Sequence, residues 1–143
     1  MTPKAILFDA VGTLLYADPD VVTVYAQAGT RFGCAVPRDE LSRRFRSAYR
    51  SVFVTTSPPR QPADHEQDRQ RWRQVVAEVF WELKETNELF EVLWRHFASA
   101  SSWRLFSDAE PAWREAQRRG MLVGGASNYD DRLLQVAAGH RLL

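Results

Sequence analysis

Asp9 is the first residue of the chain whose type and position indicate chemistry. An apolar run, residues 5–8, leads directly into this single carboxylate. The pattern predicts a buried parallel strand that ends at the carboxylate and is followed by a tight turn. Ligands of open α/β sheets bind beyond the carboxyl ends of the strands, so Asp9 is a candidate catalytic residue. An aspartate that only caps a local turn is the alternative interpretation.

Gly12 and Thr13 follow Asp9 within four positions. Glycine adopts positive φ at little cost, which allows a close turn over the strand end and directs backbone N–H groups at a bound anion. The Thr13 hydroxyl is expected within reach of the carboxylate. The turn therefore combines a candidate nucleophile with a candidate anion-binding backbone.

A second polar pair, Ser127 and Asn128, follows another short apolar run, residues 121–126. The run predicts a strand that starts after the helix ended by Gly120. Small polar residues at the carboxyl end of a strand face the same ligand crevice as Asp9. On its own this pair is a weak signal, because many strands end in Ser-Asn.

Residues 9–13, Asp-Ala-Val-Gly-Thr after an apolar strand, resemble the first signature of the haloacid dehalogenase superfamily. The most similar branch reads Phe-Asp-Ala-x-Gly-Thr-Leu and carries small helical caps. The resemblance implies that Asp9 is a covalent nucleophile that attacks phosphorus or a carbon–halogen bond. It also implies that Thr13 steadies Asp9 and that Gly12 contributes to substrate binding.

Ser127 and Asn128 resemble the second signature of that superfamily, an apolar strand that ends in Ser or Thr. The resemblance implies that the Ser127 hydroxyl and a nearby backbone N–H bind a phosphoryl oxygen or a substrate carboxylate, with Asn128 beside them. It also implies an α/β fold, a Rossmann-like core with a truncated parallel sheet made of residues 1–16 and 103–143. Residues 17–102 are expected to form an inserted α-helical cap.

The spacing of apolar residues within 17–102 favours a helical insertion, because these residues recur at helical intervals. Asp18 is expected to cap its first helix. A long helix is expected from about Asp64 to about Glu85, and another spans residues 89–97. Aromatic residues at this spacing are typical of a packed core.

Val11 departs from the phosphatases of this family, which usually carry a second aspartate at that position. Valine has no proton to give, so general acid–base help, commonly worth about 10²–10⁴-fold, has to come from elsewhere. The main-chain carbonyl of Val11 is still expected to ligate Mg²⁺, the cofactor that the resemblance implies, together with Asp9. Dehalogenases and some less typical branches also lack the second aspartate.

Two later signatures of the family, a lysine at a helix start and acids at a strand end, have no match here. Lys4 and Lys84 are the only lysines, and neither lies where the family needs one. Asp130 and Asp131 lie one turn after Ser127 and are interpreted as a favourable helix start. Mg²⁺, which prefers about six oxygens, would keep few ligands. We therefore expect a fragment or a truncated gene product with little or no activity.

The 143 residues are 45% hydrophobic and 26% charged with a net charge of +1, as in one ordinary globular domain. Balanced charge argues against a nucleic-acid binder. No apolar run approaches the ~18 residues of a membrane span, and we expect no signal peptide before the first strand. Cys34, the only cysteine, excludes an intrachain disulfide and favours the cytoplasm. His65, His96 and His140 show no metal-ligand spacing.

The sequence thus predicts a Mg²⁺-dependent phosphatase that acts on a small phosphorylated metabolite through an aspartyl-phosphate at Asp9. One alternative is a 2-haloacid dehalogenase, which displaces halide without metal, although its usual first signature has tyrosine where this chain has Val11. The other alternative is a non-catalytic fragment whose helical module binds a partner. The oligomeric state stays open.

Overall fold

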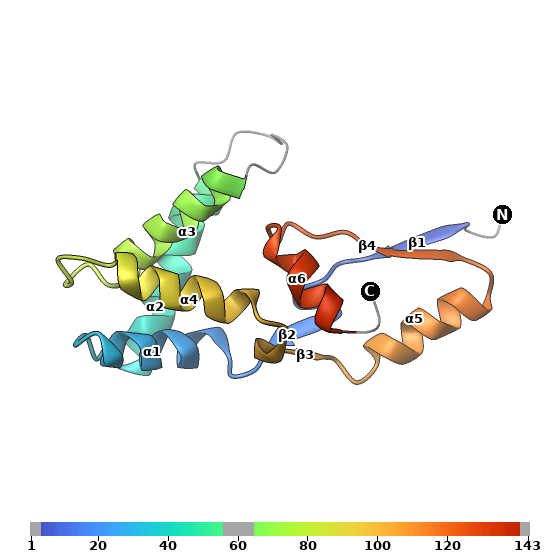
Figure 1. The fold of residues 1–143 in the computed structure, drawn as a ribbon, viewed down its shortest axis with the longest axis horizontal. Helices are drawn as coiled ribbons and strands as arrows, with labels where there is room; N and C mark the ends of the chain where they lie inside the picture. Colours follow the sequence, from blue (N-terminus) through green and yellow to red (C-terminus); the bar gives the residue numbers. More distant parts are fainter. Residues whose placement is uncertain (1–3, 56–64, 141–143) are drawn as a thin grey trace. The chain divides into compact units, whose positions relative to one another are not determined.

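The computed structural model describes residues 4–55 and 65–140. The chain forms two compact units, one made of Met1–Asp18 with Phe97–Leu143 and the other of Pro19–His96. The strands of the described chain all belong to the first unit, which we call the α/β unit, and the second is the helical unit (Figure 1). No helix in the described ranges is both long and apolar enough to cross a membrane.

Two parallel strands, β1 (Ala5–Phe8) and β4 (Leu122–Gly125), lie side by side in the α/β unit (Figure 1). Their register pairs Phe8 with Gly125, so both strands end at the same edge of the sheet. This pairing of the two apolar runs is what an α/β core with a truncated sheet requires.

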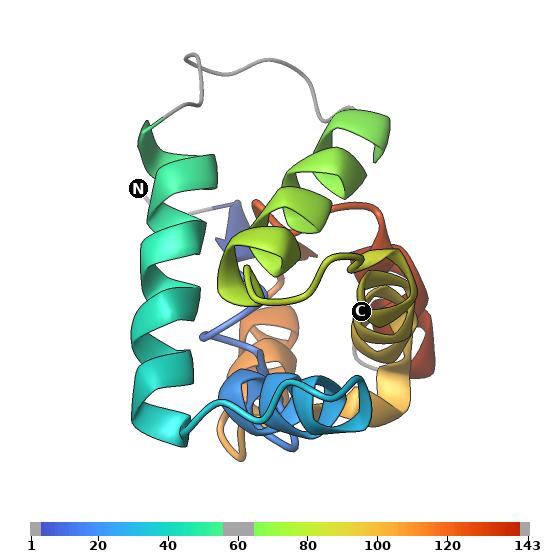
Figure 2. The same cartoon turned by 90° about the vertical axis from the view of Figure 1, so that its left-hand side faces the viewer.

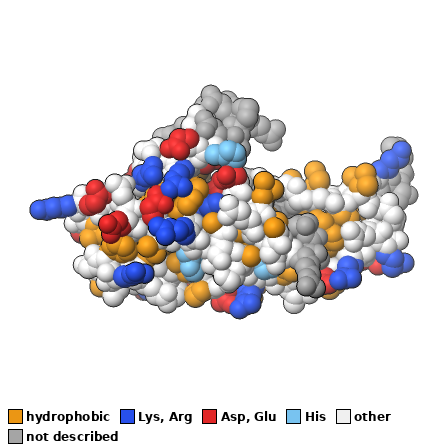
Figure 3. Space-filling model, in the orientation of Figure 1, with side chains coloured by type: hydrophobic (Ala, Val, Ile, Leu, Met, Phe, Trp, Pro, Cys, Tyr) orange, Lys and Arg blue, Asp and Glu red, His pale blue; other side chains and the backbone are white. Residues whose placement is uncertain are grey.

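The two faces of this sheet have different environments. Phe8 lies against α5 (Ala109–Arg118), where its ring stacks on Trp113 with the centroids 5.8 Å apart. Leu7 and Leu122 lie on the other face and are 68% and 75% exposed. Figure 3 shows apolar side chains at the surface over these strands. The prediction of a buried strand is therefore wrong for β1, because only one face is covered by the described chain.

A second ladder joins β2 (Leu15–Ala17) to β3 (Trp103–Leu105) in antiparallel register. The Asp18 N–H extends it by donating to the Ser102 carbonyl at 3.0 Å. The Asp18 carboxylate accepts from Nε of Arg104 at 3.1 Å. The sequence did not predict this ladder, since strands of three residues carry too little alternation to be recognised.

The helical unit begins with α1 (Val21–Arg31), which Asp20 caps. Its carboxylate accepts hydrogen bonds from the backbone N–H groups of Val22 at 3.1 Å and Thr23 at 3.2 Å. The prediction that Asp18 caps this helix is wrong, because a capping oxygen has to reach donors two or three residues ahead and Asp20 stands at that spacing.

The second helix, α2 (Arg38–Tyr49), continues into the π-helical turn η1 (Arg50–Thr55), and Figure 2 shows the two as one long helix. Next in the described chain are α3 (His65–Val79) and α4 (Asn87–Ala98). The predicted helix start at Asp64 lies outside the described residues.

The helix α3 ends at Val79, earlier than the predicted Glu85. The Leu83 N–H donates to the Phe80 carbonyl at 2.9 Å, which closes the helix with a three-residue turn. Phe80 itself is fully buried. The apolar periodicity therefore continues past the helix end, because the turn residues also pack in the core.

The core of the helical unit is apolar. Tyr25 stacks on Phe80 with ring centroids 6.0 Å apart, and a methyl group on Gly29 would lie 2.5 Å from the Phe80 ring. Nearly inaccessible side chains complete this core: Leu41, Val52, Val75, Val76, Val79, Leu89 and Phe90. These residues come from helices far apart in the chain, so the unit has a continuous core of its own.

The α/β unit closes with α6 (Arg132–Gly139), which packs on the short helix η2 (Ala100–Ser102). A methyl group on Gly139 would approach Ala100 Cβ to 2.2 Å, so this contact admits only glycine. Gly120 ends α5 with a φ of +75°, as its position in the sequence predicts.

Candidate active site

Asp9 lies directly beyond β1, at the edge where the paired strands end. The Ala126 N–H donates to the Phe8 carbonyl at 2.8 Å, which extends the ladder to this edge. The Asp9 side chain is exposed. Within residues 4–55 and 65–140 no side chain forms a hydrogen bond or ion pair with its carboxylate. The Asp9 carboxylate is thus exposed and unpaired within the described residues.

The turn after Asp9 is organised around the Ala10 carbonyl, which accepts hydrogen bonds from the N–H groups of Leu14 at 2.8 Å and Leu15 at 2.9 Å. Gly12 has a φ of +89°, as the tight turn requires. Its N–H donates to the Leu15 carbonyl at 2.8 Å. Closing the turn thus occupies the Gly12 N–H, and the contribution of Gly12 to substrate binding stays a prediction.

Val11 and Thr13 flank that glycine. Val11 is 40% exposed, and its N–H has no acceptor among the described residues. Thr13 is exposed, and its own N–H donates to the Ala10 carbonyl at 3.3 Å. No hydrogen bond joins the Thr13 hydroxyl to Asp9 in the described chain, so the structure does not bring that predicted pair together.

Ser127 and Asn128 follow β4 at the same sheet edge. The Ser127 hydroxyl is half-buried and accepts a hydrogen bond from the Tyr129 N–H at 3.1 Å. Asn128 is exposed. Because Phe8 pairs with Gly125, the residues that follow the two strands, Asp9 and Ser127, belong to one edge.

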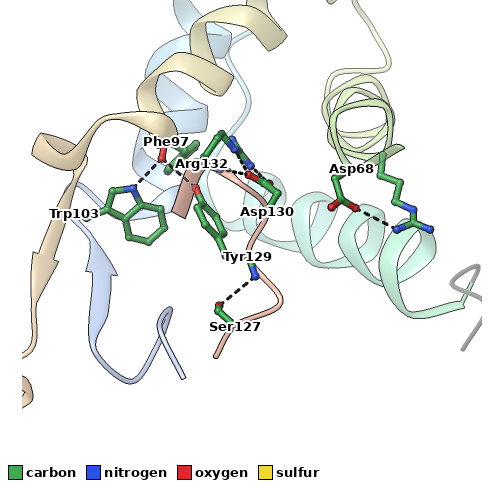
Figure 4. A network of polar contacts seen from close by, with 8 residues as sticks. Asp68, Phe97, Trp103, Ser127, Tyr129, Asp130 and Arg132 are labelled. Atoms are coloured by element: carbon green, nitrogen blue, oxygen red, sulfur yellow. Dashed lines mark hydrogen bonds and ion pairs between the residues drawn. The ribbon is translucent and has the colours of Figure 1, made fainter. Parts of the chain in front are cut away.

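A buried polar network follows Ser127, and the sequence did not predict it (Figure 4). Arg132 holds Asp130 with two hydrogen bonds, Nε to Oδ1 at 2.6 Å and Nη2 to Oδ2 at 2.5 Å. The two side chains are only 6% and 2% exposed. Asp130 therefore does more than favour a helix start. Residues two positions apart do not face each other on a helix, so the sequence does not predict this ion pair.

The residues present do not form a complete magnesium site. The Asp9 carboxylate and the Val11 carbonyl are the oxygens that the turn offers, whereas Mg²⁺ takes about six ligands in near-octahedral geometry. No group of three or more His, Cys, Asp or Glu side chains in the described ranges could hold a metal ion. A second ligand carboxylate is what these residues lack.

The site belongs to a known class of protein. A family model described as "Hydrolase: haloacid dehalogenase-like hydrolase" matches residues 3–143. The chain belongs to this family of haloacid dehalogenase-like hydrolases, in agreement with the carboxylate at the end of β1.

Curated relatives share the same description. The human protein "Haloacid dehalogenase-like hydrolase domain-containing protein 3" is 28% identical over 142 residues, which cover 95% of this chain and 56% of the relative. The Xenopus laevis protein of that name is 28% identical over 138 residues, covering 93% of this chain and 56% of the relative. The chain thus spans little more than half the length of these relatives.

A solved structure shares the fold. The structure described as "Crystal Structure analysis of a Dehalogenase" superposes with a TM-score of 0.53 at 20% sequence identity, covering 99% of this chain and 60% of that chain. At this identity the likeness supports the architecture, an α/β core with inserted helices, and says nothing about the substrate.

Proposed function

We propose that the active site of this hydrolase transfers a phosphoryl group from a small phosphate monoester to water, through a covalent intermediate on Asp9. The observation that carries the proposal is the exposed, unpaired Asp9 carboxylate at the sheet edge shared with Ser127. A carboxylate nucleophile divides one difficult hydrolysis into two easier steps.

In the first step an oxygen of the Asp9 carboxylate attacks phosphorus, and the bond from phosphorus to the leaving oxygen breaks. The Val11 N–H and the Ser127 hydroxyl would donate to the phosphoryl oxygens at this edge. Water then attacks the aspartyl-phosphate, which releases phosphate and restores the carboxylate. Atoms and charge balance with one water consumed.

Val11 restricts the leaving group. Val11, two residues after Asp9, carries no acidic group, so the departing oxygen has to take its proton from solvent. Aryl phosphates, whose leaving oxygen is a weak base, should therefore react faster than alkyl phosphates. We infer that turnover by the chain described here is weak, because neither a general acid nor a full set of magnesium ligands stands at the site.

The test is hydrolysis of p-nitrophenyl phosphate, measured with and without Mg²⁺. Asp9→Asn should lower the rate by at least about 10³-fold, the scale on which loss of a nucleophile acts. Asp108→Asn is the matched control, since Asp108 is exposed and its side chain makes no capping hydrogen bond at the start of α5. A wild-type rate equal to that of Asp9→Asn would overturn the proposal.

A 2-haloacid dehalogenase is the second candidate: the lack of an acid at Val11 is compatible with it, although its usual first signature has tyrosine at that position. Displacing halide by the Asp9 carboxylate requires no acid to protonate the leaving group and no metal. The test is chloride release from 2-chloropropionate without added metal. Release that depends on Asp9, together with no phosphate release, would favour this candidate over the phosphatase.

A further inference from the structure

The Tyr129 side chain, two residues after Ser127, has contacts on several sides (Figure 4). Its hydroxyl donates to the Phe97 carbonyl at 3.0 Å. The edge of its ring meets Trp103 with the centroids 5.4 Å apart, and the guanidinium carbon of Arg132 lies 5.1 Å from the ring centroid. Burial raises the pKa of the Tyr129 hydroxyl, which keeps it protonated and able to donate.

The Phe97 carbonyl, which accepts that hydrogen bond, is held in place by a second donor. Phe97 lies in the last turn of α4, where carbonyls have no donor within the helix. The Trp103 indole Nε1 donates to the same carbonyl at 3.0 Å, and Trp103 is buried. The two side chains therefore satisfy one helix-end carbonyl together, and each limits the movement of the other.

The residues just after Tyr129 are clamped as well. The paired side chains of Asp130 and Arg132 are almost completely buried, and the Arg132 N–H also donates to Asp130 Oδ1 at 3.2 Å. A buried bidentate pair has one favourable geometry. The backbone at Tyr129 is thus held by its own side chain and by the turn that follows it.

This rigid segment reaches Ser127 through the backbone. The Tyr129 N–H occupies a lone pair of the Ser127 hydroxyl oxygen, at 3.1 Å. A serine hydroxyl has one donor and two acceptor lone pairs, so its proton stays available for a ligand. Loosening Tyr129 would free the hydroxyl to rotate and would lower its value as a preorganised donor.

We propose that Tyr129 is a positioning residue, which ties the Ser127 segment to the Phe97 carbonyl so that the Ser127 hydroxyl proton points at a bound phosphoryl oxygen. The inference rests on the proposed function, since it names what orients the donor of that site. Tyr129 acts through Ser127 and does not itself touch the substrate.

The experiment is a titration with inorganic phosphate, followed at the amide signals of Ser127 and Asn128 in ¹⁵N-labelled protein. Tyr129→Phe removes one hydroxyl and leaves the ring in place. It should weaken phosphate binding by about tenfold, the scale of one lost hydrogen bond. Tyr16→Phe is the matched control, because the Tyr16 ring packs on Phe106 and its hydroxyl has no partner in the described chain.

A double-mutant cycle separates positioning from general stability. Ser127→Ala should also weaken binding, and adding Tyr129→Phe should cause no further loss, since the residue acts only through the serine. A merely structural role gives additive losses instead. If Tyr129→Phe fails to fold, Trp103→Phe, which removes the other donor to the Phe97 carbonyl, takes its place in the cycle.

The outcomes are distinct for the two proposals. Phosphate binding with a coupled cycle but no ester hydrolysis keeps the positioning role and overturns the phosphatase. Additive losses, or unchanged binding by Tyr129→Phe, overturn the positioning role whatever the hydrolysis assay gives. Wild-type Ser127 and Asn128 signals that do not respond to phosphate overturn both.

Discussion

The interior of the helical unit differs from that of the α/β unit. In the helical unit, large apolar side chains such as Phe80 and Phe90 have essentially no exposed surface. In the α/β unit the sheet covers one face with α5, leaves Leu7 and Leu122 exposed, and has a buried ion pair near its functional edge. Both units therefore bury apolar side chains, Leu15 and Val136 among those of the α/β unit, but among the described ion pairs the most deeply buried one lies near the candidate site.

The largest expected effect tests the apolar core of the helical unit. Phe80→Ala should lower the free energy of unfolding by about 3–5 kcal/mol, because it leaves a cavity beside Tyr25 and Gly29. Urea denaturation followed by circular dichroism measures this. Trp81→Ala is the control, since Trp81 is 68% exposed and contacts only the Arg44 guanidinium at 5.2 Å among the ring contacts of the described chain. Its loss should stay within about 1 kcal/mol.

A comparable loss is expected in the α/β unit from Arg132→Met. The substitution leaves the Asp130 carboxylate buried without its guanidinium, which costs about 3–5 kcal/mol. Arg104→Met removes the exposed ion pair with Asp18, whose side chains are 62% and 51% exposed, and should cost at most about 1 kcal/mol. Equal unfolding midpoints for the two variants would contradict the role given to the buried pair.

Glycine substitutions sharpen the contrast between the two units. Gly29→Ala places a methyl group 2.5 Å from Phe80 and 2.6 Å from the Cys34 carbonyl, so it should destabilise by about 1–3 kcal/mol. Gly124→Ala meets only the end of the Leu7 side chain, at 3.1 Å. Because the Leu7 side chain is exposed and free to move, Gly124→Ala should unfold at the same temperature as the wild type. A thermal unfolding scan measures both variants.

The open sheet face predicts an effect on association rather than on stability. Leu7→Lys should change the free energy of unfolding by less than about 0.5 kcal/mol, since Leu7 is 68% exposed. It should reduce self-association, which static light scattering over a concentration series detects. Leu134→Lys, at an equally exposed position on α6, is the comparison. A strongly destabilised Leu7→Lys protein would show that the face is covered in solution.

The smallest effect concerns a surface charge cluster on α5. Hydrogen bonds from Arg118 and Arg119 lower the pKa of Glu115 from 4.5 to about 2. A carboxyl whose pKa is lower in the folded state stabilises the fold above its ordinary pKa and loses that contribution as the pH falls toward 2. Glu115→Gln should therefore flatten the pH dependence of unfolding between about pH 4.5 and 2. Added salt should shrink the difference from the wild type.

Local sequence patterns predict the strands that lead to the candidate site residues, but not the contacts that these residues make. The strand that leads to Asp9, the strand that leads to Ser127 and the glycine stop at Gly120 follow from apolar runs and backbone preferences. The positive φ of Gly12 follows from its residue type, but the hydrogen bond from its N–H to the Leu15 carbonyl does not. Turn geometry of this kind depends on which carbonyl folds back, and no residue type specifies it.

The errors in the helices have a similar cause. Asp18 and Asp20 are chemically similar candidates for the cap of α1, and Asp20 takes the role because it lies two and three residues before the N–H groups it accepts from. The predicted end of α3 is too late because Phe80 continues the apolar stripe while the backbone already turns. In both cases the exact helix boundary decides what local propensity leaves open.

By itself the sequence determined that a carboxylate and a hydroxyl stand at the ends of two apolar strands, and that helices fill the chain between them, because apolar periodicity and strand-end polarity are local properties. Only the tertiary structure decided that the strands pair in parallel with a common edge, that one sheet face stays exposed, and that Tyr129, Asp130 and Arg132 lock the segment beside Ser127. Burial, hydrogen-bond partners and register join residues far apart in the chain, and they exist only once the backbone has folded.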